Sequence, residues 1–252
     1  MALQPWQTGV VTRIEDETGQ TRRFWIQLPA METFDFRPGQ FVTLDLPIHE
    51  KPNKRWRSYS IASWPDGTNQ IELVIVLLEG GLGTNYLFNE VKVGSELTLR
   101  GPQGVFTLPE KIDRDLFFIC TGTGIAPFRS MAHHLLNHHI PHKDIYLIFG
   151  CRKFSDCLYG PELASLQERL PGFHYIPTFS REVPSGDKLV RTGYVHAIYE
   201  EICEGKKAMD ASAELQSASF FLCGWKNMID EAKQRIQKLG YDRKAIHQEL
   251  YG

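Results

Sequence analysis

The chain has 252 residues, a length typical of one large domain or two modest ones. Hydrophobic residues make up 42% and charged residues 23%, an ordinary composition for a globular protein that argues against disorder, collagen-like repeats and a coiled coil. The 28 Lys and Arg residues and 30 Asp and Glu residues leave a net charge of −2, so no basic field favours nucleic acid as a partner.

The longest apolar runs are too short to span a membrane, and no basic segment followed by an apolar stretch opens the chain. We therefore expect neither a membrane span nor a signal peptide, and a cytoplasmic location. The five cysteines match no disulfide, iron–sulfur or zinc spacing. The five histidines from His133 to His142 scatter around the end of a predicted helix, so we expect no metal site.

Short β-rich runs separated by turn signals fill the first hundred residues. The expected strands are 9–14, 23–27, 40–46, 57–63, 71–78 and 96–100, with turns at 37–39, 65–67 and 101–104. One helix is expected at 84–89, with Thr84 as its N-cap. This spacing predicts an antiparallel barrel or sandwich.

After about residue 109 the pattern changes to strands that alternate with helices. The expected strands are 116–120, 145–149, 173–179, 219–223 and 246–250, and the expected helices are 126–138, 161–169, 195–203 and 227–239. The small, polar segment 206–217 predicts a loop insertion. Alternation of this kind predicts a doubly wound parallel sheet, so the sequence predicts one domain over residues 1–108 and a second over 109–252.

Four short motifs could bind phosphate or an aromatic ring. Thr121–Pro127 places a Gly-x-Gly-x-x-Pro turn between a buried strand and a helix, where backbone N–H groups could meet a pyrophosphate. The other three are Arg-Ser-Tyr-Ser at 57–60, Gly-Gly-Leu-Gly-Thr at 80–84, and Cys-Gly at 223–224 at the end of a predicted strand. Each motif taken alone is also compatible with an ordinary strand, turn or buried cysteine.

The order of these motifs, spread over residues 10–251, resembles the ferredoxin–NADP reductase flavoprotein family. The resemblance implies an N-terminal antiparallel β-barrel that binds FAD, over residues 1–108. A doubly wound parallel-sheet domain that binds NAD(P) is implied over residues 109–252.

The resemblance also implies roles for single residues toward FAD. Arg57 would pair with the pyrophosphate, Tyr59 would pack on the isoalloxazine, and Ser60 would hydrogen-bond near flavin N5. The residues implied for FAD are Arg57, Ser58, Tyr59, Ser60, Val74, Val76, Gly81, Leu82, Gly83, Thr84 and Thr123.

For the pyridine nucleotide, the resemblance places Gly122, Gly124, Pro127 and Arg152 at the phosphates, and Cys223, Gly224 and Met228 near the nicotinamide. Ser180 and Arg181 would hold a 2′-phosphate, which favours NADPH over NADH. Lys188 or Arg191 could add positive charge.

The end of the Cys-Gly motif and the end of the chain leave two points open. Trp225 stands where the family usually has Pro. Tyr251 would either cover the flavin or pack within its own domain. The residues expected to serve the reaction itself are Ser60, Cys223 and Tyr251.

The function that follows is an FAD-dependent NADPH oxidoreductase. It would pass hydride-derived electrons to an external one-electron acceptor: ferredoxin, flavodoxin or the iron–sulfur component of an oxygenase. The basic residues Lys51, Lys54 and Arg55 could guide an acidic carrier. Alternatives are a reductase of free flavin or ferric complexes, and a non-catalytic flavin subunit of a larger complex. Nothing in the sequence fixes the oligomeric state, and a monomer is favoured.

Overall fold

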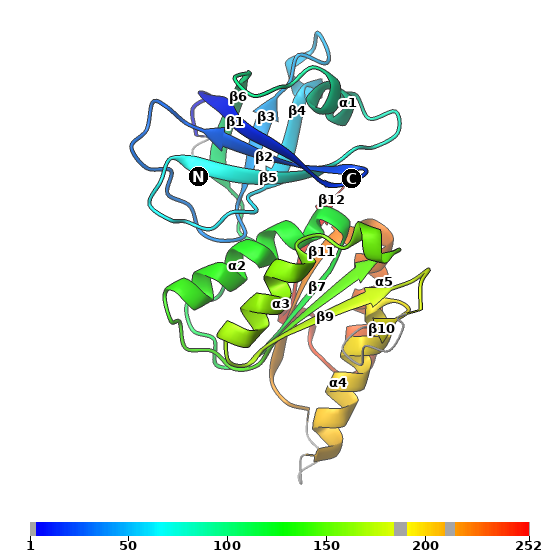
Figure 1. Cartoon of the computed structure of the whole chain (residues 1–252). Helices are drawn as coiled ribbons and strands as arrows, with labels where there is room; N and C mark the ends of the chain where they lie inside the picture. The colour runs from blue at the N-terminus through cyan, green and yellow to red at the C-terminus, as the bar shows by residue number, and fades with distance from the viewer. Residues whose placement is uncertain (1–3, 184–190, 210–214, 252) are drawn as a thin grey trace. The chain divides into compact units, whose positions relative to one another are not determined.

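The computed structural model describes residues 4–183, 191–209 and 215–251. The chain divides into two compact units, which are drawn in Figure 1. Unit 1 comprises Met1–Leu108 together with Ala126–His134, and unit 2 comprises Pro109–Ile125 together with Leu135–Gly252.

Unit 1 is built on six antiparallel strands in the order β4-β3-β6-β1-β2-β5. The strands are β1 (Gln7–Thr18), β2 (Thr21–Gln27), β3 (Phe41–Asp45), β4 (Trp56–Ser60), β5 (Gln70–Val76) and β6 (Glu96–Gln103). The two outer strands meet, because Ile61 after β4 bridges to Leu73 of β5 and the Ala62 N–H donates to the Glu72 carbonyl. This closure curls the sheet into a barrel and shortens its exposed edges.

Alternating apolar residues fill the inside of this barrel. Val11, Phe24, Ile26, Leu44 and Leu99 are all buried in one apolar core. Helix α1 (Leu82–Asn89) adds the buried side chain of Leu87 to the same core. Pro52–Lys54 forms a single 3₁₀ turn before β4.

Several expected boundaries in unit 1 were wrong, and two of the errors have a clear physical reason. The first strand runs from Gln7 to Thr18 rather than over 9–14, because its polar end continues to pair with β2. The predicted turn at 101–104 is largely strand, because β6 continues through Gly101 and Pro102 until Gln103 pairs with Phe41.

Unit 2 contains a six-stranded parallel sheet in the order β10-β9-β8-β7-β11-β12. The strands are β7 (Asp115–Thr121), β8 (Ile145–Cys151), β9 (Phe173–Phe179), β10 (Arg191–Thr192), β11 (Ala218–Trp225) and β12 (Ile246–Tyr251). Its helical segments are η2 (Gly122–Ile125), η3 (Phe154–Asp156), α3 (Gly160–Arg169), α4 (Val195–Met209), α5 (Lys226–Lys238) and η4 (Arg243–Ala245). Helix α2 (Ala126–Asn137) follows η2 in the chain, and its residues up to His134 belong to unit 1.

Figure 1 shows α3 on one face of this sheet and α4 and α5 on the other. On the latter face, Tyr199 of α4 and Ile229 of α5 pack on Phe117, Ile119 and Phe220. The chain runs outward from β7 through β8 to β9 and then returns to β11 on the other side of β7. The strand order therefore reverses between β7 and β11, where open parallel sheets bind their ligands. Both expected folds, an antiparallel barrel followed by a doubly wound parallel sheet, are confirmed.

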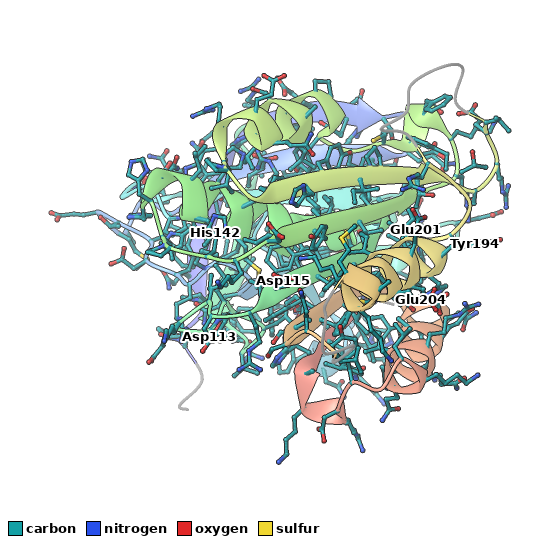
Figure 2. All side chains as sticks on the ribbon, turned by 90° about the horizontal axis from the view of Figure 1, so that it is seen from below. Asp113, Asp115, His142, Tyr194, Glu201 and Glu204 are labelled. Carbon is teal, nitrogen blue, oxygen red and sulfur yellow. The ribbon has the colours of Figure 1, made fainter. Side chains whose placement is uncertain are left out.

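Helix α4 corrects the predicted loop at 206–217, because it continues through Lys206 to Met209. Its last residues are good helix formers, and a tertiary contact holds them. Lys206 Nζ lies 2.5 Å from Asp115 Oδ2 and 2.9 Å from Asp144 Oδ2, at the amino ends of β7 and β8. Figure 2 labels Asp115 on this part of unit 2. Two carboxylates at one sheet edge thus fix the last described turn of α4.

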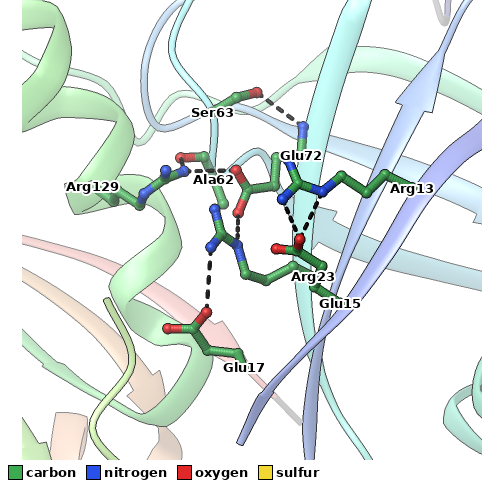
Figure 3. A network of polar contacts seen from close by, with 8 residues as sticks. All are labelled: Arg13, Glu15, Glu17, Arg23, Ala62, Ser63, Glu72 and Arg129. Carbon is green, nitrogen blue, oxygen red and sulfur yellow. Dashed lines mark hydrogen bonds and ion pairs between the residues drawn. The ribbon is translucent and has the colours of Figure 1, made fainter. Parts of the chain in front are cut away.

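A buried charge network lies in unit 1 (Figure 3). Glu72 of β5 accepts from Arg23 Nε at 2.6 Å and from Arg129 Nη1 at 3.0 Å. The side chains of Glu72 and Arg129 are each only 4% exposed. Arg129 also donates to the Ala62 carbonyl at 2.9 Å. Arg23 also pairs with Glu17 at 3.4 Å. The pair of Glu72 with Arg129 lies away from solvent, where a lone charge is very costly.

We expect Glu72→Gln to lower the free energy of unfolding by about 3–5 kcal/mol, because it leaves Arg129 buried without its carboxylate. Urea unfolding followed by circular dichroism measures the loss. The matched control is Glu15→Gln, whose ion pair with Arg13 is 40% and 58% exposed and should contribute less than about 1 kcal/mol. Equal losses in the two variants would contradict the role of the buried pair.

The Lys206 contact predicts a pH-dependent stability. Burial is the largest single influence and acts to raise the pKa of Asp144, but the hydrogen bond and charge of Lys206, together with hydrogen bonds from His174 and Tyr146, hold the pKa below its usual value. A carboxyl with a lowered pKa stabilises the fold above its unfolded pKa, and this contribution disappears as the pH falls through the folded pKa. We expect Lys206→Met to cost about 1–3 kcal/mol at pH 7. The difference from the unmodified chain should shrink as the pH falls below 4 in urea unfolding; a difference that stays constant would refute the assignment.

Candidate functional site

A glycine turn in unit 1 brings an arginine to the start of a helix. Helix α1 begins after Gly81, without a side-chain cap and without an acidic residue in its first turn. A Cβ atom at Gly83 would lie 3.0 Å from Arg57 Cγ, so the Arg57 side chain packs directly on this turn. Arg57 donates to the Lys54 and Trp56 carbonyls, and no carboxylate of the described residues forms an ion pair with it. The helix N–H groups and this guanidinium suit a phosphate.

Thr84 is not the N-cap that the sequence predicted. Gly81 occupies that position, and Thr84 lies within the first turn of α1. The Thr84 hydroxyl accepts from the Leu78 N–H at 3.1 Å and lies 3.2 Å from the Gly81 carbonyl. It therefore holds the turn closed, and the first N–H groups of α1 keep no side-chain acceptor.

The residues that follow Arg57 on β4 differ in their environments. Tyr59 packs against the barrel core, and burial raises the pKa of its phenol to about 12 although Arg57 acts to lower it. Ser60 is 3% exposed, and its Oγ has no hydrogen-bond partner among the described residues. Such a buried hydroxyl is available to a polar atom of a ligand or to water. Ser58 already bonds to Thr43, their hydroxyl oxygens lying 3.0 Å apart.

The two valines expected along FAD lie on β5. Val74 is buried and Val76 is half-buried, so Val76 is the more accessible of the two. Leu82, the first residue of α1, is 58% exposed.

A second glycine turn lies at the switch point of unit 2, directly after β7. Gly122 has a φ of +54°, a left-handed conformation that favours glycine. A Cβ atom at Gly124 would lie 2.4 Å from the Cys223 carbonyl oxygen, so only glycine allows this turn to touch the end of β11. Thr123 is half-buried, and Pro127 occupies the first turn of α2.

Sequence reasoning gave no role to Thr121, which ends β7. Its Oγ1 is buried without a hydrogen-bond partner among the described residues, and a Cβ atom at Gly224 would lie 2.6 Å from it. Its place between a buried strand and the glycine turn was the signal that could have identified it.

The Cys-Gly motif and the last strand lie together. Cys223 is fully buried, and burial raises the pKa of its thiol well above the ordinary value. The Tyr251 side chain of the neighbouring strand β12 lies close enough to this thiol to act against the larger effect of burial on its pKa. The contact favours the second reading of Tyr251, a residue packed within its own domain. Met228, one turn further along, packs on the core of unit 2.

Two arginines and a serine gather at the carboxyl ends of β8 and β9. The Arg181 N–H donates to the Arg152 carbonyl, and the Ser180 N–H donates to the Cys151 carbonyl, each at 3.0 Å. Both arginine side chains are exposed, and neither forms an ion pair with any described residue. Arg191 differs, because Glu201 neutralises it in a two-pronged ion pair with both distances 3.0 Å. Lys188 lies outside the described residues.

The histidines have other roles in the described part of the chain. His133 is buried and stacks on Trp64 with ring centroids 3.8 Å apart. Within residues 4–183, 191–209 and 215–251, no group of three or more His, Cys, Asp or Glu side chains is placed to hold a metal ion. None of the helices in these ranges has both the length and the apolar character that crossing a membrane requires.

Comparison with known proteins supports this arrangement. The model of the oxidoreductase FAD-binding domain matches residues 8–108, and that of the oxidoreductase NAD-binding domain matches residues 118–234. Ferredoxin–NADP reductase B of Sorangium cellulosum is 34% identical over 221 residues, 87% of each chain. The chain belongs to the ferredoxin–NADP reductase family. It is therefore an oxidoreductase with an FAD-binding and an NAD-binding domain.

Two further relatives extend this comparison. The phenol hydroxylase P5 protein of Acinetobacter pittii is 30% identical over 254 residues, 99% of this chain. The chain spans only 66% of that relative's length. The crystal structure of the cytochrome P450 reductase GcoB of Amycolatopsis has a TM-score of 0.83 at 27% identity, covering 98% of this chain and 70% of that one.

The residues present fit both groups. In unit 1, the orphaned Ser60 hydroxyl and the Arg57–α1 turn suit a flavin that carries a pyrophosphate. In unit 2, the open space over Gly122 and the buried Thr121 hydroxyl suit a nucleotide phosphate.

We expect Gly124→Ala to destabilise the chain by about 1–3 kcal/mol, because its Cβ would overlap the Cys223 carbonyl and force the turn away from β11. Thermal unfolding measures the change. The control is Gly205→Ala in α4, where a Cβ meets nothing within 4 Å and should add about 0.5–1 kcal/mol of stability. If both alanine variants were as stable as the parent chain, the close approach would not constrain the turn.

Proposed function

We propose that this chain is an FAD-dependent NADPH oxidoreductase that delivers electrons to an external one-electron acceptor. Residues 1–108 form its FAD-binding domain and residues 109–252 its NAD(P)-binding domain. One observation carries the proposal: each unit combines a glycine turn at the start of a helix with arginines that no described carboxylate neutralises. Guanidinium groups without a carboxylate partner, half-buried at Arg57 and exposed in unit 2, suit an anionic ligand such as a phosphate.

The chain's own residues hold and orient the reactants. Bound FAD supplies an acceptor for the hydride of NADPH and can release electrons one at a time. Arg57 and the first N–H groups of α1 hold the FAD pyrophosphate. The neutral Tyr59 ring packs on the flavin, and the Ser60 hydroxyl forms a hydrogen bond with it. Hydride transfer needs close positioning of two rings and no acid–base pair.

In unit 2, the Gly122–Gly124 turn binds the nucleotide pyrophosphate. Cys223 and Tyr251 lie at the end of the neighbouring strands, where the nicotinamide enters. We assign Tyr251 to positioning the Cys223 thiol, because its strand β12 pairs with β11 beside Cys223 and its side chain acts on the pKa of the thiol.

Selection of NADPH depends on the ends of β8 and β9. Arg152 and Arg181 project from neighbouring strand ends beside Ser180. A 2′-phosphate would meet both guanidinium groups there, whereas the 2′-hydroxyl of NADH would leave them without an anion. Arg191 takes no part, because Glu201 already neutralises it.

The acceptor is a ferredoxin, a flavodoxin or the iron–sulfur component of an oxygenase. The names of the relatives, a ferredoxin–NADP reductase and a phenol hydroxylase component, support this class of partner. Lys51 and Lys54 are exposed beside β4 and would attract an acidic carrier. Arg55 contributes less charge, because it pairs with Asp45 at 2.8 Å.

The test begins with the purified chain loaded with FAD under exclusion of oxygen. NADPH should bleach the flavin absorbance near 450 nm, and FAD should stay bound through gel filtration, unlike in a reductase of free flavin. Absence of bleaching with either NADPH or NADH would end the proposal.

Arg181→Ala then tests coenzyme selection. We expect the KM for NADPH to rise about 10- to 100-fold, the range for loss of a charged hydrogen bond, with the KM for NADH nearly unchanged. Arg169→Ala, which removes an exposed arginine at the end of α3, is the control and should alter neither value. An equal rise for both coenzymes would remove Arg181 from the 2′-phosphate site.

A further inference from the structure

Trp225 is an exposed aromatic residue at the end of a buried strand. The first seven residues of β11 are buried, whereas Trp225 is 50% exposed. It also forms the N-cap of α5 without a side-chain cap. The residue therefore lies at the carboxyl edge of the sheet, next to the switch point between β7 and β11. A half-exposed indole at this edge is accessible to a ligand bound there.

Two close backbone contacts fix the start of Trp225. Gly124 touches the Cys223 carbonyl, and Gly224, with a φ of +135°, lies against Thr121. The glycine turn after β7 and the end of β11 are thus in direct contact, and each restricts the backbone position of the other. The position from which the indole extends is set by backbone contacts on both sides.

The indole N–H lies over the glycine turn. Trp225 Nε1 is 3.9 Å from the place that a Cβ atom would take at Gly122, and no described atom outside residues 121–123 is closer. No described residue accepts a hydrogen bond from this N–H. The indole N–H of Trp225 is thus an unused hydrogen-bond donor beside Gly122, which has a left-handed backbone conformation.

The surroundings favour an anion at this place. The first turn of α5 contains no acidic residue. The N–H groups at the start of α5, whose N-cap side chain is an indole, have no side-chain acceptor. Helix N-termini with free N–H groups favour negative charge.

We propose that the Trp225 indole N–H donates a hydrogen bond to the pyrophosphate of the pyridine nucleotide bound at the Gly122–Gly124 turn. This inference rests on the proposed function and adds a nucleotide-binding residue to it. The proline that the family usually has at this position offers neither an indole nor a donor, so Trp225 gives this chain a phosphate contact of its own.

Trp225 also provides a direct signal. The five tryptophans are Trp6, Trp25, Trp56, Trp64 and Trp225. Trp225 is thus the single tryptophan in residues 109–252. A nucleotide in contact with it should change the protein fluorescence without any turnover.

The experiment titrates the FAD-loaded chain with NADP⁺ and, separately, with 2′-AMP, which has the 2′-phosphate but no pyrophosphate. We expect Trp225→Phe to weaken NADP⁺ binding about 10- to 100-fold, as for loss of a hydrogen bond to a charged group, and to leave 2′-AMP binding unchanged. Arg181→Ala should weaken both ligands. Trp225→His keeps a ring N–H and should restore part of the affinity.

Trp6→Phe is the matched control, because Trp6 is 37% exposed and lies in unit 1. It should bind both ligands like the parent chain and keep the fluorescence change that Trp225→Phe loses. Unchanged or tighter NADP⁺ binding in Trp225→Phe would overturn the inference, as would equal weakening of 2′-AMP. A parent chain that binds no NADP⁺ and shows no bleaching with NADPH would instead refute the proposed function.

Discussion

The contact between Gly124 and the carbonyl of Cys223 is the constraint on which the nucleotide site of unit 2 depends. With no side chain between them, the turn after β7 and the end of β11 come into direct backbone contact. Beside this contact, the space next to Gly122 stays accessible to a ligand. The contact also fixes the backbone position of Gly224, from which Trp225 follows. The Cys223 thiol itself is buried, and its raised pKa leaves it neutral. A neutral thiol adds no charge that would repel a phosphate or a nicotinamide.

The arginines divide into two groups by their partners. Arg23, Arg129 and Arg191 are balanced by carboxylates and hold strands and helices in place. Arg57, Arg152 and Arg181 have no ion pair among the described residues. A protein with a net charge of −2 has enough carboxylates to neutralise them, so their lack of partners follows from where the fold places them. Those places are a helix start in unit 1 and two strand ends in unit 2, where phosphates bind.

Most strands could be predicted because their apolar residues follow the periodicity of a barrel or of a buried parallel sheet. The strand at Phe173–Phe179 has the predicted bounds. The errors lie where polar residues take part in tertiary contacts. The end of β1 pairs with β2 despite its polar composition, and Lys206 extends α4 because Asp115 and Asp144 lie beside it. The two-residue strand β10 depends entirely on its pairing with β9 and leaves no periodic signal.

The sequence by itself determined the class of each unit and the identity of the phosphate-directed motifs, because periodicity and glycine turns are local properties of the chain. Only the tertiary structure decided which charged and polar groups lack partners. It paired Arg191 with Glu201 and gave Arg181 no such ion pair among the described residues. It also left the hydroxyls of Ser60 and Thr121 without hydrogen-bond partners there, and it placed the Trp225 N–H near Gly122. These properties depend on distances between residues far apart in the chain, and no local pattern encodes such distances.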